Sequence, residues 1–497
     1  FDREPLHWPL EFPEVFAQGG FDAIIGNPPF LGGQKLTGAL GHAYRERLVS
    51  AIGRNARGSA DLVAYFLLRA HDLLNPGGQT GLIATNTLAQ GDTREVGLDQ
   101  LAAGAVTLRQ AIKSQPWPSQ SAALEFCAVW SSLAALGATA ERRADGVVVA
   151  GITPSLEAES RVTGNPHRLQ GSSGISFIGS YVLGLGFTMT PAEAAALITK
   201  DERNRDVLCP YLNGQDLNSR PDNSGSRWVI NFHDWSEDQA RTYPDCYDQV
   251  RRLVKPERDK NNRKPRRERW WQFAERAPAV YQAIAGLGRV VVITRVSKTV
   301  IPVLVPTGQV ISEAVVVFAT DDPALLALLS SAPHYWWAVG RASSMKADLR
   351  YTPSDVFETF ALPELTPELR VLGDRLDTYR RNVMLSRQAG LTATYNLVFD
   401  PGCNDDDIVE LRRIHRDIDE ATCRAYGWDD LVVQGLDHGF HSAGAYTRYT
   451  IGLAAQREIL DRLLELNHQR YTKEKSQGLH DKKKVGRKSQ SGQPGLF

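Results

Sequence analysis

The chain has 497 residues, 42% of them hydrophobic and 23% charged, and its formal net charge is zero. This is the composition of a soluble globular protein, and the length predicts two to four domains at roughly 100–200 residues each. Because the net charge is zero, the total charge gives no indication of a nucleic-acid partner. Only local clusters of basic residues can indicate such a partner. No apolar run approaches the ~18 residues of a transmembrane helix, and we expect neither a membrane span nor a signal peptide.

Five cysteines are scattered along the chain, namely Cys127, Cys209, Cys246, Cys403 and Cys423. They form no Cys-x-x-Cys pair and have no histidine at ligand spacing, which predicts neither a metal site nor a disulfide framework. Such cysteine usage fits a reducing cytoplasm. The first residue is Phe1 rather than Met, and residues 1–20 resemble the interior of a domain. We therefore expect the chain to be an N-terminally truncated fragment.

Residues 21–30 have the sequence Phe-Asp-Ala-Ile-Ile-Gly-Asn-Pro-Pro-Phe. The apolar run from Ala23 to Ile25 predicts a strand that is covered on both faces in a parallel sheet. Gly26 lets the chain turn at the carboxyl end of the strand, where open α/β sheets bind their ligands. Two successive prolines then fix φ and remove two backbone donors, so the carbonyl of Pro28 is held rigidly.

This loop suits chemistry on an exocyclic amino group of a nucleobase. The side-chain oxygen of Asn27 and the carbonyl of Pro28 can accept both hydrogens of that group and direct its lone pair. Phe30 can stack on the base, which is worth roughly 1–3 kcal/mol. Catalysis would then rest on positioning and a few directed hydrogen bonds, with no metal. The alternative is that Asn-Pro-Pro is only a turn, since all three residues favour turns.

The following residues alternate between helix and strand up to about residue 135. The pattern predicts a helix over 59–74 that is stopped by 75–78, a strand over 80–85, a helix over 92–101, and strands over 105–113 and 122–131. This alternation is typical of a parallel sheet. Residues 1–135 are therefore expected to be the second half of a doubly wound α/β domain.

These segments together resemble a known enzyme family. Asn27–Phe30 resembles motif IV of the amino-group methyltransferases that use S-adenosylmethionine. Ala60-Asp61-Leu62 with Tyr65-Phe66, then residues 75–78 and 81–86, resemble motifs V and VI. The pattern is similar to adenine-N6 DNA methyltransferases of the Eco57I type, which include large restriction–modification enzymes and phage-defence methylases. The resemblance implies a Rossmann-like fold, S-adenosylmethionine as cofactor and duplex DNA as partner.

The resemblance also implies roles for single residues. Asn27, Pro28, Pro29 and Phe30 would be catalytic. Phe30 and Trp117 would hold the extruded base, although Trp117 is equally a surface-loop tryptophan. Asp22, Asn27 and Asp61 would contact the cofactor, although Asp61 is better explained as an acid at a helix N-terminus.

One part of the family pattern is missing. The glycine-rich cofactor loop of the family precedes motif IV, but only 26 residues precede Asn27 and they contain no such loop. The acid that would hold the ribose hydroxyls is missing too. A later Gly-Leu-Gly at Gly184–Gly186 is followed by an N-capped helix at Thr190-Pro191, so we interpret it as a structural turn. We expect the cofactor site of this chain to be incomplete, with a second polypeptide or the missing N-terminal region supplying the loop and any nuclease.

Residues 136–172 have little periodicity and are expected to be a linker. Residues 173–365 contain short strands, aromatics and glycine turns, which predicts a mixed α+β domain. Strands are expected at 175–177, 181–183, 227–232, 289–294, 301–305 and 314–319. Residues 211–217 with 228–232, and residues 351–363, resemble the start and end of the target-recognition domain in the same enzymes.

A basic stretch lies within this domain. Residues 251–269 contain ten Lys or Arg and three acids, and Trp270-Trp271 follows at once. Such a stretch can neutralise DNA phosphates, although most charge runs are solvated helix faces or loops. The DNA-binding residues are expected to include Arg263, Lys264, Arg266, Arg267, Arg269 and Trp270. Candidates for reading base edges, by residue type alone, are Arg295, Lys298, Arg341, Lys346 and Arg350.

Residues 366–470 are expected to form a helical C-terminal region. A stripe from Ile408 through Leu411 and His415 to Ala425 has the spacing of an amphipathic helix, with His415 as a structural residue. Residues 391–428 again resemble the C-terminal region of the family. A further helix is expected over 451–466. Residues 471–497 are expected to be a basic disordered tail.

The sequence therefore predicts a site-specific DNA methyltransferase that transfers methyl from S-adenosylmethionine to adenine N6, in restriction–modification or phage defence, and that is inactive as this chain alone. Three alternatives remain open. One is a cytosine-N4 DNA methyltransferase, because motif IV does not separate the two bases. Another is methylation of a protein glutamine, which needs the same two acceptors but is performed by much smaller enzymes. The third is a DNA-specificity subunit that needs a second chain for its cofactor site.

Overall fold

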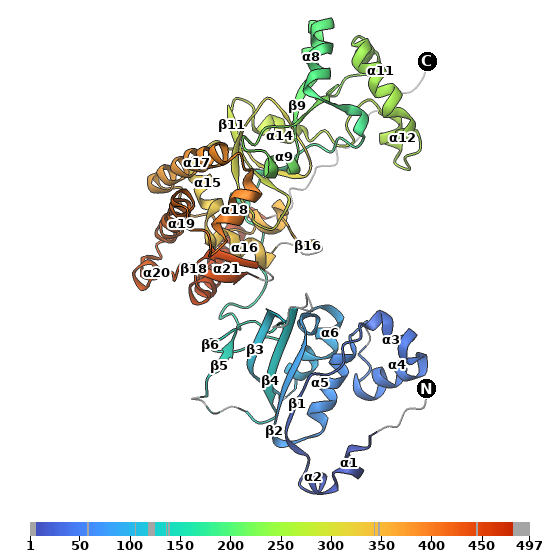
Figure 1. The fold of residues 1–497 in the computed structure, drawn as a ribbon, viewed down its shortest axis with the longest axis vertical. Coiled ribbons are helices and arrows are strands. Elements are labelled where there is room, and N and C mark those ends of the chain that lie inside the picture. Colours follow the sequence, from blue (N-terminus) through green and yellow to red (C-terminus); the bar gives the residue numbers. More distant parts are fainter. Residues whose placement is uncertain are drawn as a thin grey trace, which may run out of the picture. The chain divides into compact units, whose positions relative to one another are not determined.

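The computed structural model describes residues 6–56, 59–104, 106–117, 125–135, 137, 140–341, 343–345, 348–443 and 446–480. The chain divides into a first unit, Phe1–Thr163 with His441–Arg448, and a second unit, Gly164–Phe440 with Tyr449–Phe497 (Figure 1). Each unit has its own hydrophobic core. Among the described residues, no helix combines the length and hydropathy needed to cross a membrane.

The first unit is built on a six-stranded sheet of order β1-β2-β4-β3-β5-β6. Its strands are β1 (Phe21–Gly26), β2 (Leu74–Thr85), β3 (Thr107–Pro116), β4 (Glu125–Ser132), β5 (Arg142–Ala144) and β6 (Val147–Val149). Its α-helices are α1 (Trp8–Glu11), α2 (Pro13–Ala17), α3 (Gly33–Leu40), α4 (His42–Arg47), α5 (Leu62–Asp72), α6 (Gly91–Val96) and α7 (Leu98–Ala102). The α/β class is confirmed, but the sheet is mixed. β1 and β2 are parallel, whereas β4 runs antiparallel to β2 and β3.

The prediction that β1 is covered on both faces is wrong. Among the described residues, β1 is the edge strand of the sheet and pairs with β2 alone. Ile24 packs toward the core of the first unit, but Ile25 on the opposite face is 86% exposed. An apolar run alone cannot distinguish a strand covered on both faces from one covered on a single face.

Part of the expected linker belongs to this sheet. Residues 142–149 form β5 and β6, which pair antiparallel across Asp145-Gly146. Both turn residues have positive φ, 50° for Asp145 and 83° for Gly146, as a two-residue hairpin turn requires. The Asp-Gly pair was the sequence signal for this hairpin. Similarly, the helix expected over 92–101 is divided into α6 and α7 at Gly97, a poor helix former.

The second unit contains two four-stranded sheets, of order β14-β9-β10-β8 and β13-β11-β15-β7, and a three-stranded sheet β12-β17-β16. The strands are β7 (Ser176–Ile178), β8 (Thr188–Met189), β9 (Leu208–Leu212), β10 (Arg227–Ile230), β11 (Arg289–Thr294), β12 (Val296–Ser297), β13 (Val303–Pro306), β14 (Val310–Ile311), β15 (Val315–Phe318), β16 (Ser343–Met345) and β17 (Asp348–Arg350). β18 (Gly439–Ala443) and β19 (Tyr446–Thr450) form a separate two-stranded sheet. Of the predicted strands, only 181–183 is missing, replaced by isolated bridges at Ser180 and Tyr181.

The helices of the second unit follow two patterns. Short helices lie among the sheets: α8 (Pro191–Lys200), α9 (Gly214–Ser219), α10 (Glu237–Arg241), α11 (Pro244–Leu253), α12 (Lys255–Asp259), α13 (Lys264–Glu268) and α14 (Pro278–Ala283). The C-terminal part is mainly helical and includes α15 (Pro323–Ser330), α16 (Ala332–Arg341), α17 (Pro367–Arg387), α18 (Leu391–Val398), α19 (Asp406–Ala425), α20 (Asp429–Gln434) and α21 (Leu453–Ser476).

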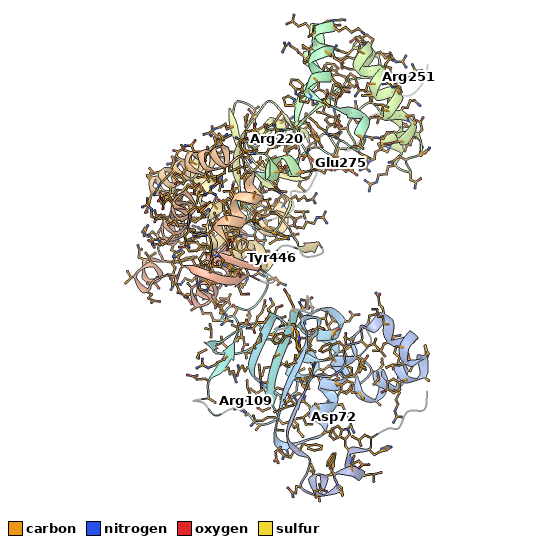
Figure 2. All side chains as sticks on the ribbon, viewed as in Figure 1. Asp72, Arg109, Arg220, Arg251, Glu275 and Tyr446 are labelled. Atoms are coloured by element: carbon orange, nitrogen blue, oxygen red, sulfur yellow. The ribbon has the colours of Figure 1, made fainter. Side chains whose placement is uncertain are left out.

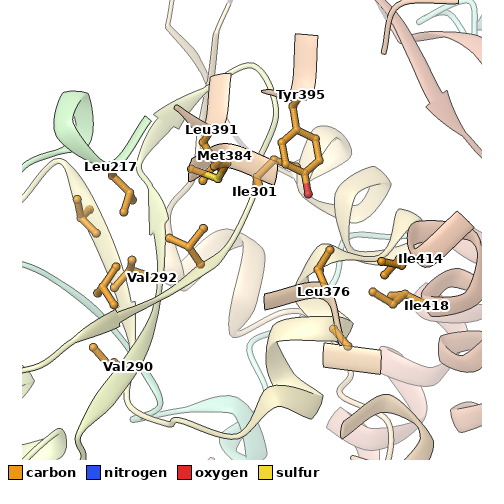
Figure 3. Packing of buried hydrophobic residues seen from close by; sticks show 14 of the residues in the cluster. Leu217, Val290, Val292, Ile301, Leu376, Met384, Leu391, Tyr395, Ile414 and Ile418 are labelled. Atoms are coloured by element: carbon orange, nitrogen blue, oxygen red, sulfur yellow. The ribbon is translucent and has the colours of Figure 1, made fainter. Parts of the chain in front are cut away.

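One core joins the sheets to these long helices. Val290 and Val292 of β11 belong to the same buried cluster as Leu376 of α17 and Ile414 and Ile418 of α19 (Figure 3). The expected recognition domain, 173–365, and the expected helical region, 366–470, are therefore parts of one unit. Burial of apolar surface at about 25 cal/mol per Å² is what holds them together.

The C-terminal helices follow the predicted pattern with one difference. The α19 stripe is buried, and Nε2 of His415 lies 2.8 Å from the hydroxyl of Tyr395, in agreement with a structural role. α21 continues to Ser476, beyond the boundary expected at residue 470. The predicted tail therefore begins as helix, and residues 481–497 lie outside the described residues.

Candidate functional site

The acceptor loop, residues Asn27–Phe30, directly follows β1. β1 and β2 run parallel, with Gly26 opposite Leu82, so the loop leaves the sheet at its carboxyl edge. The side chain of Asn27 is exposed, whereas Pro28 is buried and fixed in place. Within the described part of the chain, neither the Asn27 amide nor the Pro28 carbonyl has a hydrogen-bond partner. Two acceptors on a rigid backbone are therefore free for a donor from outside.

Phe30 and Leu31 anchor the other end of the loop. Both are partly buried and pack against the core of the first unit. The backbone N–H of Leu31 donates to Oδ1 of Asp61 at 3.0 Å. The loop is thus held between β1 and the start of α5, which limits its motion.

Asp61 is the N-cap of α5. Its Oδ1 also accepts from the N–H of Val63 at 3.1 Å, and its own N–H donates to the hydroxyl of Thr93 at 3.1 Å. The side chain is only 8% exposed. The helix-cap interpretation is therefore confirmed, whereas contact between Asp61 and a cofactor stays a prediction.

Asp22 is not brought to the acceptor loop. It lies near the start of β1, where its carboxylate accepts from Nδ2 of Asn75 at 2.6 Å. Asn27 lies five positions after Asp22 along the strand. At about 3.3 Å per position, the two residues are roughly 16 Å apart. Its predicted part in a cofactor site shared with Asn27 has no support in this geometry.

Trp117 lies at the same edge of the sheet as the acceptor loop. Thr85 of β2 is opposite Phe126 of β4, and Phe126 is opposite Gln115 of β3, so the residues that follow β2 and β3 share this edge. The ring of Trp117 packs edge-on against Phe126 with centroids 5.5 Å apart. The structure therefore places Trp117 and Asn27 at one edge of the sheet, with β2 and β4 between their strands. Contact of Trp117 with an extruded base stays a prediction.

Sequence reasoning missed Glu125 at this edge. Its Oε2 accepts from Nδ2 of Asn86 at 3.1 Å and from the hydroxyl of Ser114 at 2.6 Å. It is half-buried, and it fixes the ends of three strands together. A single Glu at the start of a strand gives no sequence signal for such a role.

The basic stretch, residues 251–269, is divided between exposed and structural cations. The side chains of Arg263, Lys264, Arg267 and Arg269 are exposed, as is that of Arg252. Arg251 on α11 is exposed too (Figure 2). Arg266 is half-buried, 5.3 Å from the ring centre of Tyr181 and 3.1 Å from Glu275. Arg258 is 2% exposed and donates to the carbonyls of Val182 and Leu183.

The prediction that Trp270 binds DNA is wrong for the structure described. The side chain is 4% exposed and packs against Tyr247 and Trp271 in the core of this region. Adjacent Trp and basic residues in sequence do not reveal which of them face solvent. The interpretation of Gly184–Gly186 as a structural turn is confirmed, because Gly184 has a φ of 139° and leads into a 3-10 turn over Leu185–Phe187. A Cβ on Gly186 would lie 2.4 Å from Cβ of Leu253, so this turn is closely packed.

Family comparisons match both parts of the chain. Residues 2–104 match the Eco57I restriction-modification methylase family, and residues 162–364 match the MmeI target recognition domain. These two segments are therefore similar to a restriction–modification methylase and to a target recognition domain. No curated protein matches the chain.

Two solved structures are similar to this chain, and the likeness to the first concerns the fold alone. The Type IIL restriction-modification enzyme MmeI in complex with DNA is similar, with a TM-score of 0.52 and 18% identity over 90% of this chain. The type IIG restriction endonuclease BpuSI gives a TM-score of 0.39 and 12% identity over 91% of this chain and 54% of its own length. This chain spans 57% of the length of the MmeI structure.

The acceptor loop lies in the segment that matches the methylase family, and the basic stretch lies in the segment that matches the target recognition domain. Among the base-edge candidates, the guanidinium of Arg341 lies 4.9 Å from the ring centre of Trp337, and Lys346 lies outside the described residues. In the part of the chain that the structure describes, no group of three His, Cys, Asp or Glu side chains is placed to hold a metal ion.

Proposed function

We propose that this chain is the base-binding and DNA-binding part of a methyltransferase that uses S-adenosylmethionine to methylate adenine N6 at specific sites in duplex DNA. It would act in restriction–modification or phage defence. The observation that carries this proposal is the pair of free acceptors, the Asn27 amide and the Pro28 carbonyl, at the carboxyl edge of β1. An amino group with two hydrogens is the donor that fits them.

The roles of the residues follow from this geometry. Asn27 and Pro28 would each accept one hydrogen of the N6 amino group, which directs the nitrogen lone pair away from the ring. The target adenine must leave the duplex, which costs a few kcal/mol, and the rings of Phe30 and Trp117 would offset part of that cost by stacking. When bound, S-adenosylmethionine supplies the methyl group.

The two acids predicted to contact the cofactor are not available beside the acceptor loop. Asp61 already accepts two backbone hydrogen bonds, and Asp22 lies at the other end of β1. Neither carboxylate is free beside the acceptor loop. The free edge of β1, with Ile25 exposed, would pair with an upstream segment or a second polypeptide that brings the cofactor loop. We therefore expect no turnover by this chain alone.

Two further candidates rest on the same loop. Cytosine N4 presents the same two hydrogens, so the acceptors alone do not separate the two bases. The lack of a complete cofactor site favours a specificity subunit that works with a catalytic partner. Methylation of a protein glutamine is less well supported, since the match of residues 162–364 to a target recognition domain favours DNA.

The test combines binding and product analysis. Calorimetry with S-adenosylmethionine is performed on this chain and on one extended upstream through the adjoining reading frame. We expect binding only by the extended chain. That protein is then incubated with labelled cofactor and duplex DNA, and the nucleosides are separated. N6-methyladenine supports the proposal, N4-methylcytosine favours the second candidate, and no methylated base with DNA binding intact favours the specificity subunit.

A further inference from the structure

A cavity of about 440 Å³ lies in the target recognition domain, away from the basic stretch. It is formed by α9, the junction of β11 with β12, the residues before β15, and the end of β17. Its polar lining residues are Gln215, Asn218, Thr294, Arg295, Glu313 and Arg350. We name this cavity the arginine pocket.

Arg295 is held in the pocket by its backbone. Its N–H donates to the carbonyl of Ala314 at 2.8 Å, and its carbonyl accepts from the N–H of Tyr351 at 2.7 Å. The next residue, Val296, is opposite Arg350 in the β12–β17 pair. The two arginines are thus fixed to adjacent strand segments that lie side by side.

Both guanidinium groups lack partners. In the described part of the chain, no hydrogen bond or ion pair is made by the side chain of Arg295 or Arg350, and Nε of Arg295 is buried without a partner. Burial lowers the pKa of Arg295 and the positive charge of Arg350 lowers it further, whereas the negative charge of Glu313 opposes this shift. A buried donor without a partner is unfavourable, so Nε of Arg295 favours a ligand that accepts hydrogen bonds here.

The rest of the lining distinguishes a base edge from a phosphate. Glu313 is an acid, and it would repel a phosphate. Among the described residues, its Oε2 accepts a hydrogen bond from the adjacent Ser312 hydroxyl at 3.0 Å and from no other side chain. Gln215 is exposed and adds an amide, and Oδ1 of Asn218 accepts from Thr294 at 3.2 Å. Guanidinium, amide and carboxylate groups together are the set that reads major-groove base edges.

We propose that the arginine pocket reads a guanine of the recognition sequence, with the guanidinium of Arg295 donating to guanine O6 and N7. Arg350 adds a second donor beside it. Glu313 accepts from the N4 amino group of the paired cytosine. This inference rests on the proposed DNA methyltransferase function, because it names a base that the same protein recognises.

The test uses the full 497-residue chain. Wild type selects its preferred sequence from a pool of randomised duplexes, and Arg295→Ala and Arg295→Lys are put through the same selection. Arg203→Gln is the matched control, because it removes one exposed cation that pairs with Asp201 outside the pocket. We expect Arg295→Ala to lose the preference for guanine at one position, by roughly tenfold to a hundredfold, with other positions unchanged. Arg295→Lys should retain part of the preference for guanine, and Arg203→Gln should select the same sequence as wild type.

A second measurement separates base from phosphate. Replacing the selected guanine with 7-deazaguanine, which lacks the N7 acceptor, should weaken wild type but not Arg295→Ala. A uniform loss of affinity for all duplexes with a smaller salt dependence would assign Arg295 to a phosphate and overturn the proposal. An unchanged selection, or no selected sequence, would also overturn it. Failure of the methylation proposal would instead appear as missing product with sequence selection intact.

Discussion

The backbone N–H of Leu31 donates a hydrogen bond to the carboxylate of Asp61, thirty residues further along the chain, at 3.0 Å. The same oxygen caps α5 through Val63. One carboxylate therefore fixes both the end of the acceptor loop and the first turn of a buried helix. This contact ties the end of the acceptor loop to α5.

Replacing Asp61 should loosen the acceptor loop. Asp61→Ala removes a helix cap and leaves the Leu31 N–H without an acceptor, which together cost about 1–3 kcal/mol in the free energy of unfolding. Asp61→Asn keeps an oxygen acceptor and should cost less. Chemical denaturation measures the stability, and hydrogen exchange at Leu31 measures the loop. Equal exchange rates in wild type and Asp61→Ala would show that this bond does not hold the loop.

The two glycines after the loop should respond differently to alanine. A Cβ on Gly33 would lie 2.1 Å from the backbone oxygen of Ser59, whereas a Cβ on Gly32 meets nothing within 4 Å. Gly33→Ala must push α3 away from residue 59 and should destabilise the first unit by about 1–3 kcal/mol. Gly32→Ala is the matched control, with an expected change below roughly 0.5 kcal/mol. Similar melting temperatures for the two variants would contradict this packing.

The exposed cations of the basic stretch should set the salt dependence of DNA binding. Replacing Arg263, Arg267 and Arg269 with Gln should reduce the slope of log affinity against log salt by about 0.9 for each phosphate that is no longer neutralised. Trp270→Phe is the control, because its buried ring predicts lower stability with an unchanged slope. Fluorescence anisotropy over a range of roughly 50 to 300 mM salt measures the slope. A triple variant with the wild-type slope would place these cations away from DNA.

His334 should make the second unit sensitive to acid. Its ring is fully buried, with Nδ1 2.7 Å from the carbonyl of Leu329 and Nε2 2.9 Å from the hydroxyl of Tyr351. Burial lowers its pKa to about 4. In the unfolded chain, His334 binds a proton near the ordinary pKa of about 6.5. The free energy of unfolding is therefore highest above that pH, and it falls by on the order of 3 kcal/mol as the pH is lowered from roughly 6.5 to 4.

The measurement is denaturant unfolding followed by tryptophan fluorescence across the same range of pH, from about 4 to 7.5. His334→Gln lacks the titrating ring, so its stability should change less between about pH 6.5 and 5 than that of wild type. Its absolute stability should be lower, because it loses both hydrogen bonds. Parallel pH profiles for the two proteins would show that His334 is not the group responsible.

Local signals in the sequence predicted much of this architecture. The strand before Asn27, the Asp61 cap, the Thr190-Pro191 helix start and the α19 stripe all depend on residues close together in the chain, and each appears in the structure. The capping box between Thr190 and Glu193 is present in full. Such features are set by short-range hydrogen bonds and by periodicity, which a sequence displays directly.

Features that depend on distant residues were not predictable in the same way. Nothing in the sequence shows that β1 is an edge strand, that Trp270 is buried beside Tyr247, or that Arg295 lies next to Arg350. These relations come from strand order and packing between segments far apart in the chain. For the acceptor loop, the sequence supplied the residues, but only the fold shows that Trp117 shares its edge of the sheet.

The most direct test of the proposed function is methyl transfer by Asn27→Ala. The variant and wild type are prepared in the upstream-extended protein, and N6-methyladenine formation and duplex affinity are measured in parallel. Removing one of two directing hydrogen bonds should reduce turnover by at least about a hundredfold, with duplex affinity and melting temperature unchanged. Normal turnover by Asn27→Ala, with cofactor bound, would contradict the assignment of the acceptor loop as the site of methylation.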